Sequence, residues 1–206
     1  MPAAPRVTAI AQIVADVLAA DARSRPRASA VRILAIDGPS ASGKSTLARR
    51  IRACVPGTTV IHGDDFVSWT DLETWWPRFE ADVLAPLRAG RDARYQVRDW
   101  HGDEFGSSLK GWKTARPTPL VVVEGVGVSR AAAQVDYAVW VEAPESVRME
   151  RGLARDGADH SGAWRNWLLM EQDFFVRDAT MTRADLRVDG APAIAHDPAT
   201  HVILLP

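Results

Sequence analysis

The fold is decided by the stretch Ile33-Leu34-Ala35-Ile36-Asp37-Gly38-Pro39-Ser40-Ala41-Ser42-Gly43-Lys44-Ser45-Thr46. From Gly38 onward this stretch follows the pattern G-x-x-x-x-G-K-S, which is the pattern of a phosphate-binding loop. The apolar run 31–36 in front of the loop predicts a strand, and residues 46–51 behind it predict a helix. A Gly/Ser turn can match the pattern by chance, but the motif also requires these flanks, and both are present.

The residue types of this loop predict a site for the phosphates of a nucleoside triphosphate. Gly38 and Gly43 allow backbone conformations that a Cβ atom would obstruct, so successive N–H groups can turn toward a phosphate. The helix that begins near Lys44 adds the positive end of its dipole. Lys44 can reach the β- and γ-phosphates, and the Ser45 hydroxyl can ligate Mg²⁺. The predicted nucleotide contacts are Gly38, Ser40, Ala41, Ser42, Gly43, Lys44, Ser45 and Thr46.

Length and composition predict one globular domain. The chain has 206 residues, of which 47% are hydrophobic, and this is enough for a substantial core. Its formal net charge of -1 gives no electrostatic reason to expect a nucleic acid or a membrane as partner. The partner that the motifs below imply is a small-molecule acceptor, and the sequence leaves open whether copies of the chain form a homo-oligomer.

The cysteine content and the hydropathy pattern favour the cytoplasm. Cys54 is the single cysteine and cannot form an intrachain disulfide, which agrees with a reducing compartment. No run of residues is long and apolar enough to span a bilayer. The first five residues lack the charged and apolar regions of a secretory signal.

Strand-like and helical stretches alternate along the chain. Strands are predicted at 31–36, 58–62, 120–125, 136–141, 184–188 and 201–205, and helices at 46–53, from Pro77 toward Pro86, at 144–155 and at 161–178. Residues 94–100 have some strand-like alternation, and we expect a Gly-rich loop after them, through Gly111. The alternation predicts an α/β fold with a parallel sheet covered on both faces. Such sheets bind ligands beyond the carboxyl ends of their strands.

Residues 1–30 form a separate segment in this prediction, before a main domain at 31–206. An apolar stripe predicts a helix over 7–20, and the polar connector 21–29 follows it. The stripe consists of Ile10, Ile13, Val14, Val17 and Leu18. We expect this helix to pack on the main domain, and a dimerisation arm is the alternative.

Three carboxylates follow predicted strands, which is where an α/β sheet carries its chemistry. Asp64 and Asp65 come after the second strand, and Glu124 closes the third. Asp64 and Glu124 can hold Mg²⁺ beside Ser45, or Asp64 can accept the proton of an acceptor hydroxyl. The alternatives are a helix cap for the two aspartates and an arginine ion pair for Glu124.

Arg148, Arg151 and Arg155 share one face of a predicted helix, because they are three and then four residues apart. A polar loop follows at 157–162. Arginines that close over the γ-phosphoryl group stabilise its charge and exclude water, so this region predicts a lid at about 151–163. The alternative is a solvated basic face that pairs with Glu145 or Glu150.

Tryptophans are concentrated between the second and third predicted strands, at about 67–117, where we expect an insert that forms the acceptor site. They are Trp69, Trp75, Trp76, Trp100 and Trp112. Each one alone is more typical of a core position. As a group they predict an apolar pocket, in which aromatic rings stack on a planar ligand or enclose a sugar.

These motifs, taken in order, resemble the uridine kinase/phosphoribulokinase family of phosphate-loop (P-loop) kinases. The resemblance runs from about residue 31 to 190. It rests on the phosphate loop, Gly63-Asp64-Asp65-Phe66, Val123-Glu124-Gly125 and the arginine series that ends in Arg155-Asp156. It implies a P-loop NTPase three-layer sandwich with a central five-stranded parallel sheet and a lid, and ATP with Mg²⁺ as the donor.

The resemblance also implies roles for individual residues. Asp64 is the expected base at the acceptor hydroxyl, and Ser45, Asp64 and Glu124 are the expected metal site. Arg148, Arg151 and Arg155 are expected on the phosphates, with Lys44, Arg151 and Arg155 acting in transfer.

The sequence departs from this family around the acceptor. Uridine–cytidine kinases carry Tyr-Asp-Phe and a nearby histidine at the base, whereas this chain has Arg98-Asp99-Trp100 followed by His101. An aspartate that contacts the ribose follows a proline in those kinases, whereas Arg78 follows Pro77 here. An arginine in that site would favour a phosphorylated or acidic acceptor.

The sequence thus predicts an ATP-dependent small-molecule kinase that phosphorylates a hydroxyl group. Nucleosides such as uridine or cytidine are candidate acceptors, and a vitamin, a sugar or a sugar phosphate is the alternative. A nucleotide-binding regulatory module without transfer is a second hypothesis, although Asp64, Glu124 and the lid arginines are all present. A nucleic-acid-acting ATPase is a third hypothesis, but this sequence contains no separate basic domain that would bind a nucleic acid.

Overall fold

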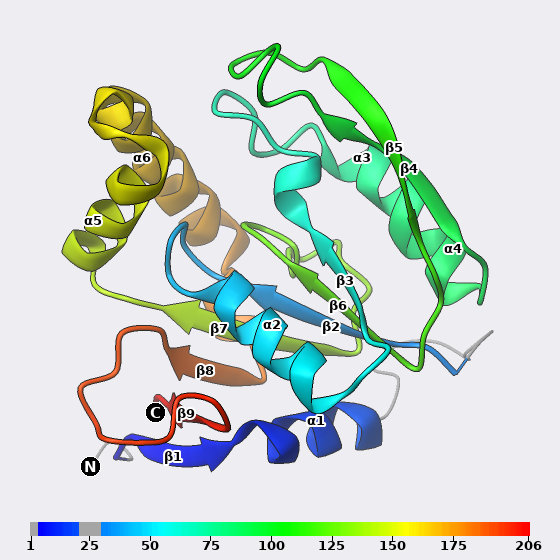
Figure 1. Ribbon diagram of the computed structural model, residues 1–206, viewed down its shortest axis with the longest axis vertical. Coiled ribbons are helices and arrows are strands. Elements are labelled where there is room, and N and C mark those ends of the chain that lie inside the picture. The colour runs from blue at the N-terminus through cyan, green and yellow to red at the C-terminus, as the bar shows by residue number, and fades with distance from the viewer. Residues whose placement is uncertain (1–3, 21–29) are drawn as a thin grey trace.

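The computed structural model describes residues 4–20 and 30–206, so the connector predicted at 21–29 lies outside the described residues. The chain forms a seven-stranded sheet in the order β1-β9-β8-β7-β2-β6-β3 (Figure 1). Five neighbouring strands of this sheet run parallel, as the sequence predicted. They are β2 (Arg32–Asp37), β3 (Thr59–His62), β6 (Leu120–Glu124), β7 (Tyr137–Glu142) and β8 (Leu186–Asp189).

The central strands are apolar because both of their faces are covered. All five residues of β6 are buried, and so are five of the six residues of β2. Such a strand needs no alternation, which is why these runs could be recognised from sequence. Glu124 pairs in register with Ile36 on β2 and with His62 on β3, so the polar residues that end these strands meet at one edge of the sheet.

Two antiparallel strands extend the parallel core on the side of β8. They are β9 (His201–Leu204) and β1 (Arg6–Ala9), and Arg6 lies opposite Leu204. β9 agrees with the sequence prediction. β1 does not, because we predicted helix from residue 7, whereas α1 (Ile10–Ala19) begins only at Ile10.

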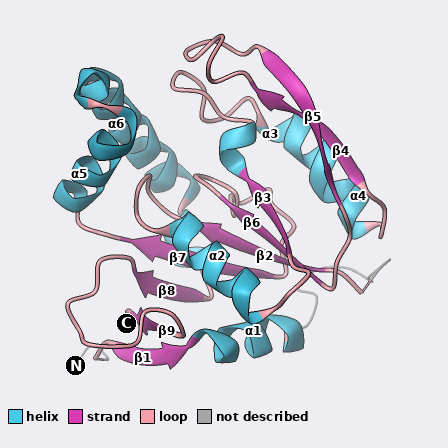
Figure 2. Cartoon of the chain, in the orientation of Figure 1, coloured by secondary structure: helices cyan, strands magenta, loops and turns pink. Residues whose placement is uncertain are grey.

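Helices cover both faces of the sheet, so the predicted three layers are present (Figure 2). On one face, α1 and α2 (Lys44–Cys54) bury apolar residues such as Ile13 and Ile51 with the sheet residue Leu34. On the other face, α6 (Ser161–Asp178) packs Trp167 and Phe174 into a second cluster. Four residues of the predicted α1 stripe are buried, as expected for a helix that packs on the main domain, whereas the fifth, Leu18, is 42% exposed.

A helical segment and a two-stranded ribbon lie between β3 and β6, and both differ from the prediction in detail. The segment runs from α3 (Trp76–Phe79) through one turn of π-helix (Glu80–Leu84) into α4 (Ala85–Arg88). Pro86 does not end it, because proline is tolerated in the first turn of a helical segment, and the wider turn before it absorbs the mismatch.

The ribbon consists of β4 (Ala93–Arg98) and β5 (Leu109–Ala115). The expected loop is present from residue 99 to 108, but it does not reach Gly111, because β5 begins at Leu109 and pairs with β4. Figure 1 shows the ribbon beside α3 and α4, at one end of the molecule.

Two helices lie at the carboxyl edge of the sheet, across from the ribbon (Figure 1). They are α5 (Glu145–Asp156) and α6, and a 3₁₀ turn at Ala158–His160 joins them where we predicted a polar loop. We call this pair the α5–α6 hairpin. None of the described helices combines the length and the hydropathy that a membrane span requires.

Candidate active site

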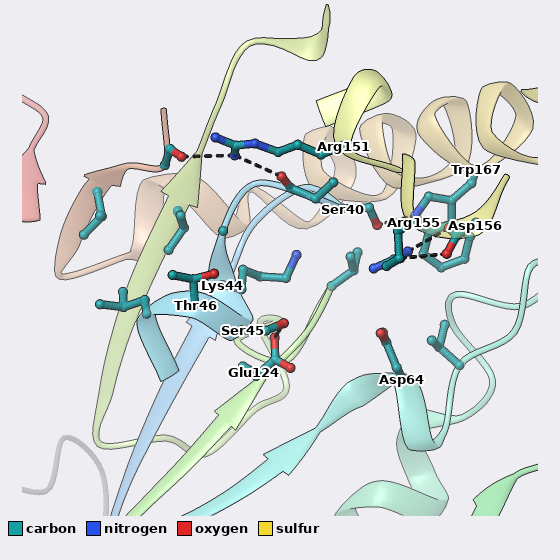
Figure 3. Close-up of a pocket in the computed structure, with 18 of the residues that line it drawn as sticks. Ser40, Lys44, Ser45, Thr46, Asp64, Glu124, Arg151, Arg155, Asp156 and Trp167 are labelled. Atoms are coloured by element: carbon teal, nitrogen blue, oxygen red, sulfur yellow. Dashed lines mark hydrogen bonds and ion pairs between the residues drawn. The ribbon is translucent and has the colours of Figure 1, made fainter. Parts of the chain in front are cut away.

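A cavity of about 1090 Å³ opens at the carboxyl edge of the sheet, between the insert and the α5–α6 hairpin. Its lining includes the predicted site residues Ser40, Ala41, Gly43, Lys44, Ser45, Thr46, Asp64, Glu124, Arg151 and Arg155. Three other predicted residues, Gly38, Ser42 and Arg148, do not line it. Figure 3 shows Lys44, Ser45 and Glu124 in one part of the cavity, with Asp64 and Arg155 across from them.

The phosphate loop sits between β2 and α2 and is held in shape mainly by its own backbone. Ala41 and Gly43 take positive φ angles of 59° and 113°. Gly38 has a φ of 134°, and a Cβ atom there would lie 2.1 Å from the carbonyl oxygen of Val141, so only glycine fits. The Lys44 ammonium donates hydrogen bonds to the carbonyls of Gly38 (2.9 Å) and Pro39 (2.8 Å). The loop is thus already wrapped around its lysine.

A buried carboxylate ties the phosphate loop to the segment after β6. Asp37 accepts hydrogen bonds from the backbone N–H groups of Gly38, Gly127 and Ser129 and from the Ser129 hydroxyl, all at 2.7–2.9 Å. Burial raises the pKa of Asp37 above its usual value, although these hydrogen bonds act in the opposite direction. The sequence analysis gave Asp37 no role.

Glu124 is the centre of a chain of contacts on the floor of the cavity. The Ser45 hydroxyl donates to Glu124 Oε2 at 3.1 Å, and His62 Nδ1 lies 2.5 Å from Glu124 Oε1. Burial would raise the pKa of Glu124, but the hydrogen bond with His62 and the charge of Lys44 outweigh it, so that pKa lies below the usual range. Glu124 is therefore an anion in this site. Its partner is His62, the last residue of β3, to which the sequence analysis gave no role.

Asp64 follows β3 on a 3₁₀ turn, Gly63–Asp65, and lines the same cavity. Burial, together with the negative charge of Glu124, raises the pKa of Asp64, while Lys44 and Arg155 act against that shift. Asp65, whose role the sequence left open, is an ion-pair residue, since Lys113 Nζ lies 2.7 Å from its Oδ1. The two neighbouring aspartates thus have different environments.

The oxygens near the phosphate loop suit Mg²⁺ when a nucleotide supplies the other ligands. Ser45 Oγ and Glu124 Oε2 are hard oxygen donors 3.1 Å apart, and Asp64 is a third on the same cavity wall. Within residues 4–20 and 30–206, no group of three or more His, Cys, Asp or Glu side chains forms a cage for a metal. This donor set agrees with a magnesium ion that keeps waters and phosphate oxygens as ligands.

The three predicted lid arginines lie in different surroundings. Arg155 pairs with Asp156, which raises the pKa of its guanidinium. Arg151 Nη1 donates to the carbonyl oxygens of Gly190 (3.1 Å) and Ala41 (3.4 Å), as Figure 3 shows. Arg148 is buried away from the cavity and donates to Glu171 Oε1 at 2.6 Å. The prediction that Arg148 contacts the nucleotide therefore finds no support in this geometry.

Glu171 on α6 is a site residue that the sequence analysis missed. Its Oε2 accepts hydrogen bonds from the Ser40 backbone N–H (2.8 Å) and from Trp167 Nε1 (3.1 Å), while Arg148 binds Oε1. It is 2% exposed. This one side chain connects both helices of the hairpin to the phosphate loop. Its place within an apolar helical stripe, four residues after Trp167, is the signal that could have identified it.

The cavity has two walls on either side of the phosphate loop. The donor wall, toward β7 and β8, consists of Leu47, Arg50, Val141, Val188, Asp189, Gly190, Pro192, His196, Pro198 and Val202. The acceptor wall, toward the insert, consists of Val67, Trp69, Trp100, His101, Glu104, Asp156, His160 and Trp167. The sequence analysis expected the acceptor wall and gave no role to the segment 189–198.

Only part of the tryptophan group faces the cavity. Trp69 and Trp100 line it, as expected for a pocket. Trp75 and Trp76 are buried in the core of the insert, and Trp112 is an exposed ring beneath Arg94. Trp167 on α6, which lies outside this group, also lines the cavity.

The two arginines that distinguished the acceptor region in sequence do not line the cavity. Arg98 is buried and donates to the carbonyl oxygens of Val67, Ser108 and Glu104. Arg78 donates to the carbonyl oxygen of Gln96 and stacks on Phe66. The expectation that an arginine here receives a phosphorylated or acidic acceptor is therefore contradicted, because both guanidiniums hold the backbone of the insert.

Comparison with known proteins places this site in a family. The model of the AAA domain matches residues 34–166, which contain the phosphate loop, the insert and the lid arginines. No curated protein sequence gives a significant match.

Solved structures of other proteins share the fold of this chain at low sequence identity. A possible uridine kinase from Bacillus stearothermophilus is 19% identical, with a TM-score of 0.61 over 86% of this chain and 96% of that one. Phosphoribulokinase from Rhodobacter spheroides is 15% identical, with a TM-score of 0.50 over 86% of this chain and 81% of that one. The resemblance to this group therefore holds at the level of the fold.

Proposed function

The chain belongs to the AAA-domain family of P-loop proteins, and we propose that it is a kinase that transfers the γ-phosphoryl group of ATP to a hydroxyl of a small molecule. One observation carries this proposal. Asp64 lines the same cavity as Lys44, Ser45 and Glu124, between the phosphate loop and the acceptor wall. A carboxylate in that position serves a reaction with an acceptor hydroxyl.

The reaction forms one bond and breaks another without any redox change. The acceptor oxygen forms a bond to the γ-phosphorus of ATP, the bond from that phosphorus to the β,γ-bridging oxygen breaks, and ADP leaves. The proton of the acceptor hydroxyl goes to Asp64. When bound, Mg²⁺ supplies positive charge that neutralises the phosphate oxygens.

The donor end of the cavity supplies position and charge. The N–H groups of the loop and the start of α2 receive phosphate oxygens. Lys44 exchanges its two carbonyl partners for phosphate oxygens, and Arg151 and Arg155 add charge where the transferred group develops it. Ser45 and Glu124 would hold the metal, which leaves Asp64 for the acceptor hydroxyl. These groups lower the barrier by orientation and by electrostatic stabilisation.

Asp64 is the residue that links donor and acceptor. Burial raises the pKa of Asp64, and a higher pKa makes its carboxylate a stronger base than that of an ordinary surface aspartate. The anionic state of Glu124 keeps that side chain available for the metal instead.

The test is an ADP-release assay with ATP and Mg²⁺ against nucleosides, vitamins, sugars and sugar phosphates. We expect acceptor-dependent turnover with at least one of these, which EDTA abolishes and which DNA and RNA do not stimulate. Asp64→Asn should lower kcat by about 10²–10⁴-fold while ATP still binds. The matched control is Asp65→Asn, since Asp65 pairs with Lys113 and does not line the cavity. Near-full turnover of Asp64→Asn would refute the base, and stoichiometric ATP binding without turnover on the whole panel would favour a regulatory module.

A further inference from the structure

The acceptor wall combines indole rings with a carboxylate. Trp69 lies edge-on to Trp100 and to Trp167, with ring centroids 6.3 and 6.0 Å apart. All three rings line the cavity, and they come from the insert and from the α5–α6 hairpin. Faces and edges of indoles favour planar rings and cations.

Glu104 is held in one orientation at this wall by contacts to one of its two carboxylate oxygens. Its Oε1 receives Trp69 Nε1 at 3.0 Å and lies 2.7 Å from His160 Nε2. Its Oε2 has no hydrogen-bond donor among residues 4–20 and 30–206. Because Glu104 lines the cavity, this oxygen is free to accept a hydrogen bond from a ligand.

Cations are scarce at the acceptor wall. Among the described residues that form this wall there is no lysine or arginine, and its basic groups are the imidazoles of His101 and His160. Arg98 is committed to three backbone carbonyls. Arg155 lines the cavity, but the proposed function assigns its charge to the transferred phosphoryl group. A phosphorylated acceptor would bring anionic oxygens to Glu104 without a guanidinium to receive them.

We propose that the acceptor is an uncharged or cationic molecule with a planar ring, and that Glu104 is the residue that selects it. The indoles of Trp69, Trp100 and Trp167 enclose the ring, and Glu104 Oε2 accepts an N–H or O–H of the ligand. Glu104 also repels an acceptor that already carries a phosphate or a carboxylate. This inference rests on the proposed function and narrows its acceptor class.

A purely structural role for Glu104, as a connection between the insert and the hairpin, predicts something different. Glu104→Gln retains an oxygen for Trp69 and His160 but removes the negative charge. If Glu104 has only a structural role, Glu104→Gln should not change how the affinity depends on the charge of the ligand. If Glu104 selects the ligand, that dependence should be lost with its carboxylate.

The experiment uses three nucleosides of similar shape and different charge: 3-methylcytidine, uridine and orotidine, which are cationic, neutral and anionic. Their binding is measured by the intrinsic tryptophan fluorescence of the full chain. We expect the wild type to bind 3-methylcytidine at least tenfold more tightly than orotidine, with uridine between them. Glu104→Gln should reduce this ratio about tenfold. Glu73→Gln is the matched control, because Glu73 is a half-exposed insert residue that pairs with Arg177 outside this cavity.

Three outcomes would overturn the inference: an unchanged charge preference in Glu104→Gln, tighter binding of orotidine, or no binding of any of the three nucleosides. The readout does not depend on turnover. Charge-dependent binding without phosphoryl transfer would therefore refute the proposed kinase while the role of Glu104 stands. Transfer to orotidine or to ribulose 5-phosphate in preference to the uncharged compounds would refute the role of Glu104, while the proposed kinase activity would stand.

Discussion

The donor and acceptor ends of the cavity are built in different ways. Backbone groups of one continuous segment form the donor end, and buried polar side chains such as Asp37 and Glu171 hold that segment. The acceptor end is formed by side chains from two elements, the insert and the α5–α6 hairpin, that meet through Glu104 and His160. A site made of backbone groups suits the phosphates of the nucleotide, which are the same in every reaction. A site made of side chains can be adapted by substitution to a different acceptor. Substitutions at the two ends should therefore have separable effects.

The largest effect is expected where the donor end loses its support. Glu171→Ala leaves Arg148 buried without its partner and frees the Ser40 N–H. We expect a loss of about 3–5 kcal/mol in the free energy of unfolding, as for other broken buried ion pairs. Urea denaturation measures this loss. Glu171→Gln should lose less, since it still accepts hydrogen bonds from Ser40 and Trp167, and equal losses in the two variants would contradict the electrostatic explanation.

The next effect is catalytic. Lys44→Ala should lower kcat/KM by about 10²–10³-fold for every acceptor, because the proposed function assigns the charge of Lys44 to the transferred group. Steady-state kinetics with two different acceptors test whether the loss is the same for both. Lys110→Ala, at an exposed position of β5, serves as the control. A loss that depended on the acceptor would show that the two ends are not separable.

A smaller effect is expected at the donor wall. A Cβ atom at Gly190 would lie 1.8 Å from the Ser42 carbonyl oxygen, so Gly190→Ala must displace the segment that Arg151 contacts. We expect a cost of about 1–3 kcal/mol in stability and a higher KM for ATP, with the KM of the acceptor unchanged. Thermal unfolding and kinetics measure these changes. Gly162→Ala provides the comparison, because a Cβ atom there meets nothing within 4 Å, and a similar loss in that variant would refute the steric explanation.

The smallest effect is expected at the acceptor wall. Trp69→Phe keeps a planar ring and removes the N–H that Glu104 accepts. Because Glu104 keeps its contact with His160, we expect only part of the contribution of such a hydrogen bond to be lost, and a rise of about fivefold in the KM of the acceptor, at constant KM for ATP. Trp112→Phe, whose ring is exposed away from the cavity, should change neither value. A change in the KM for ATP upon Trp69→Phe would contradict the division between the two ends.

The same division explains what could be predicted from sequence. The phosphate loop, its strand and its helix are contiguous, and the apolar runs of β2 and β6 follow from burial on both faces. β1 and β5 were missed because short strands with exposed polar residues depend on a partner distant in the chain or across a turn.

Burial explains the errors at individual site residues. Helical spacing shows that Arg148 and Arg151 share a face, but only tertiary packing decides that Glu171 buries the first of them. Arg98 has a side chain that suits an anion site, but its donors are taken by the carbonyls of Val67 and of the loop that contains Glu104 and Ser108. The residue types therefore predicted which functional groups the chain contains, and packing determined which of these groups remain available to a ligand.

The pairing of β1 with β9 has a consequence for how the chain assembles. Arg6 lies opposite Leu204, so this edge joins segments separated by the whole P-loop unit. During translation β1 emerges from the ribosome long before its partner, and loop closure over such a separation is slow. The apolar face of α1 can dock on the finished parallel sheet without waiting for β9. We expect the edge that holds the first described residues to close last, as the final step of folding, and to be the first part to open in hydrogen exchange.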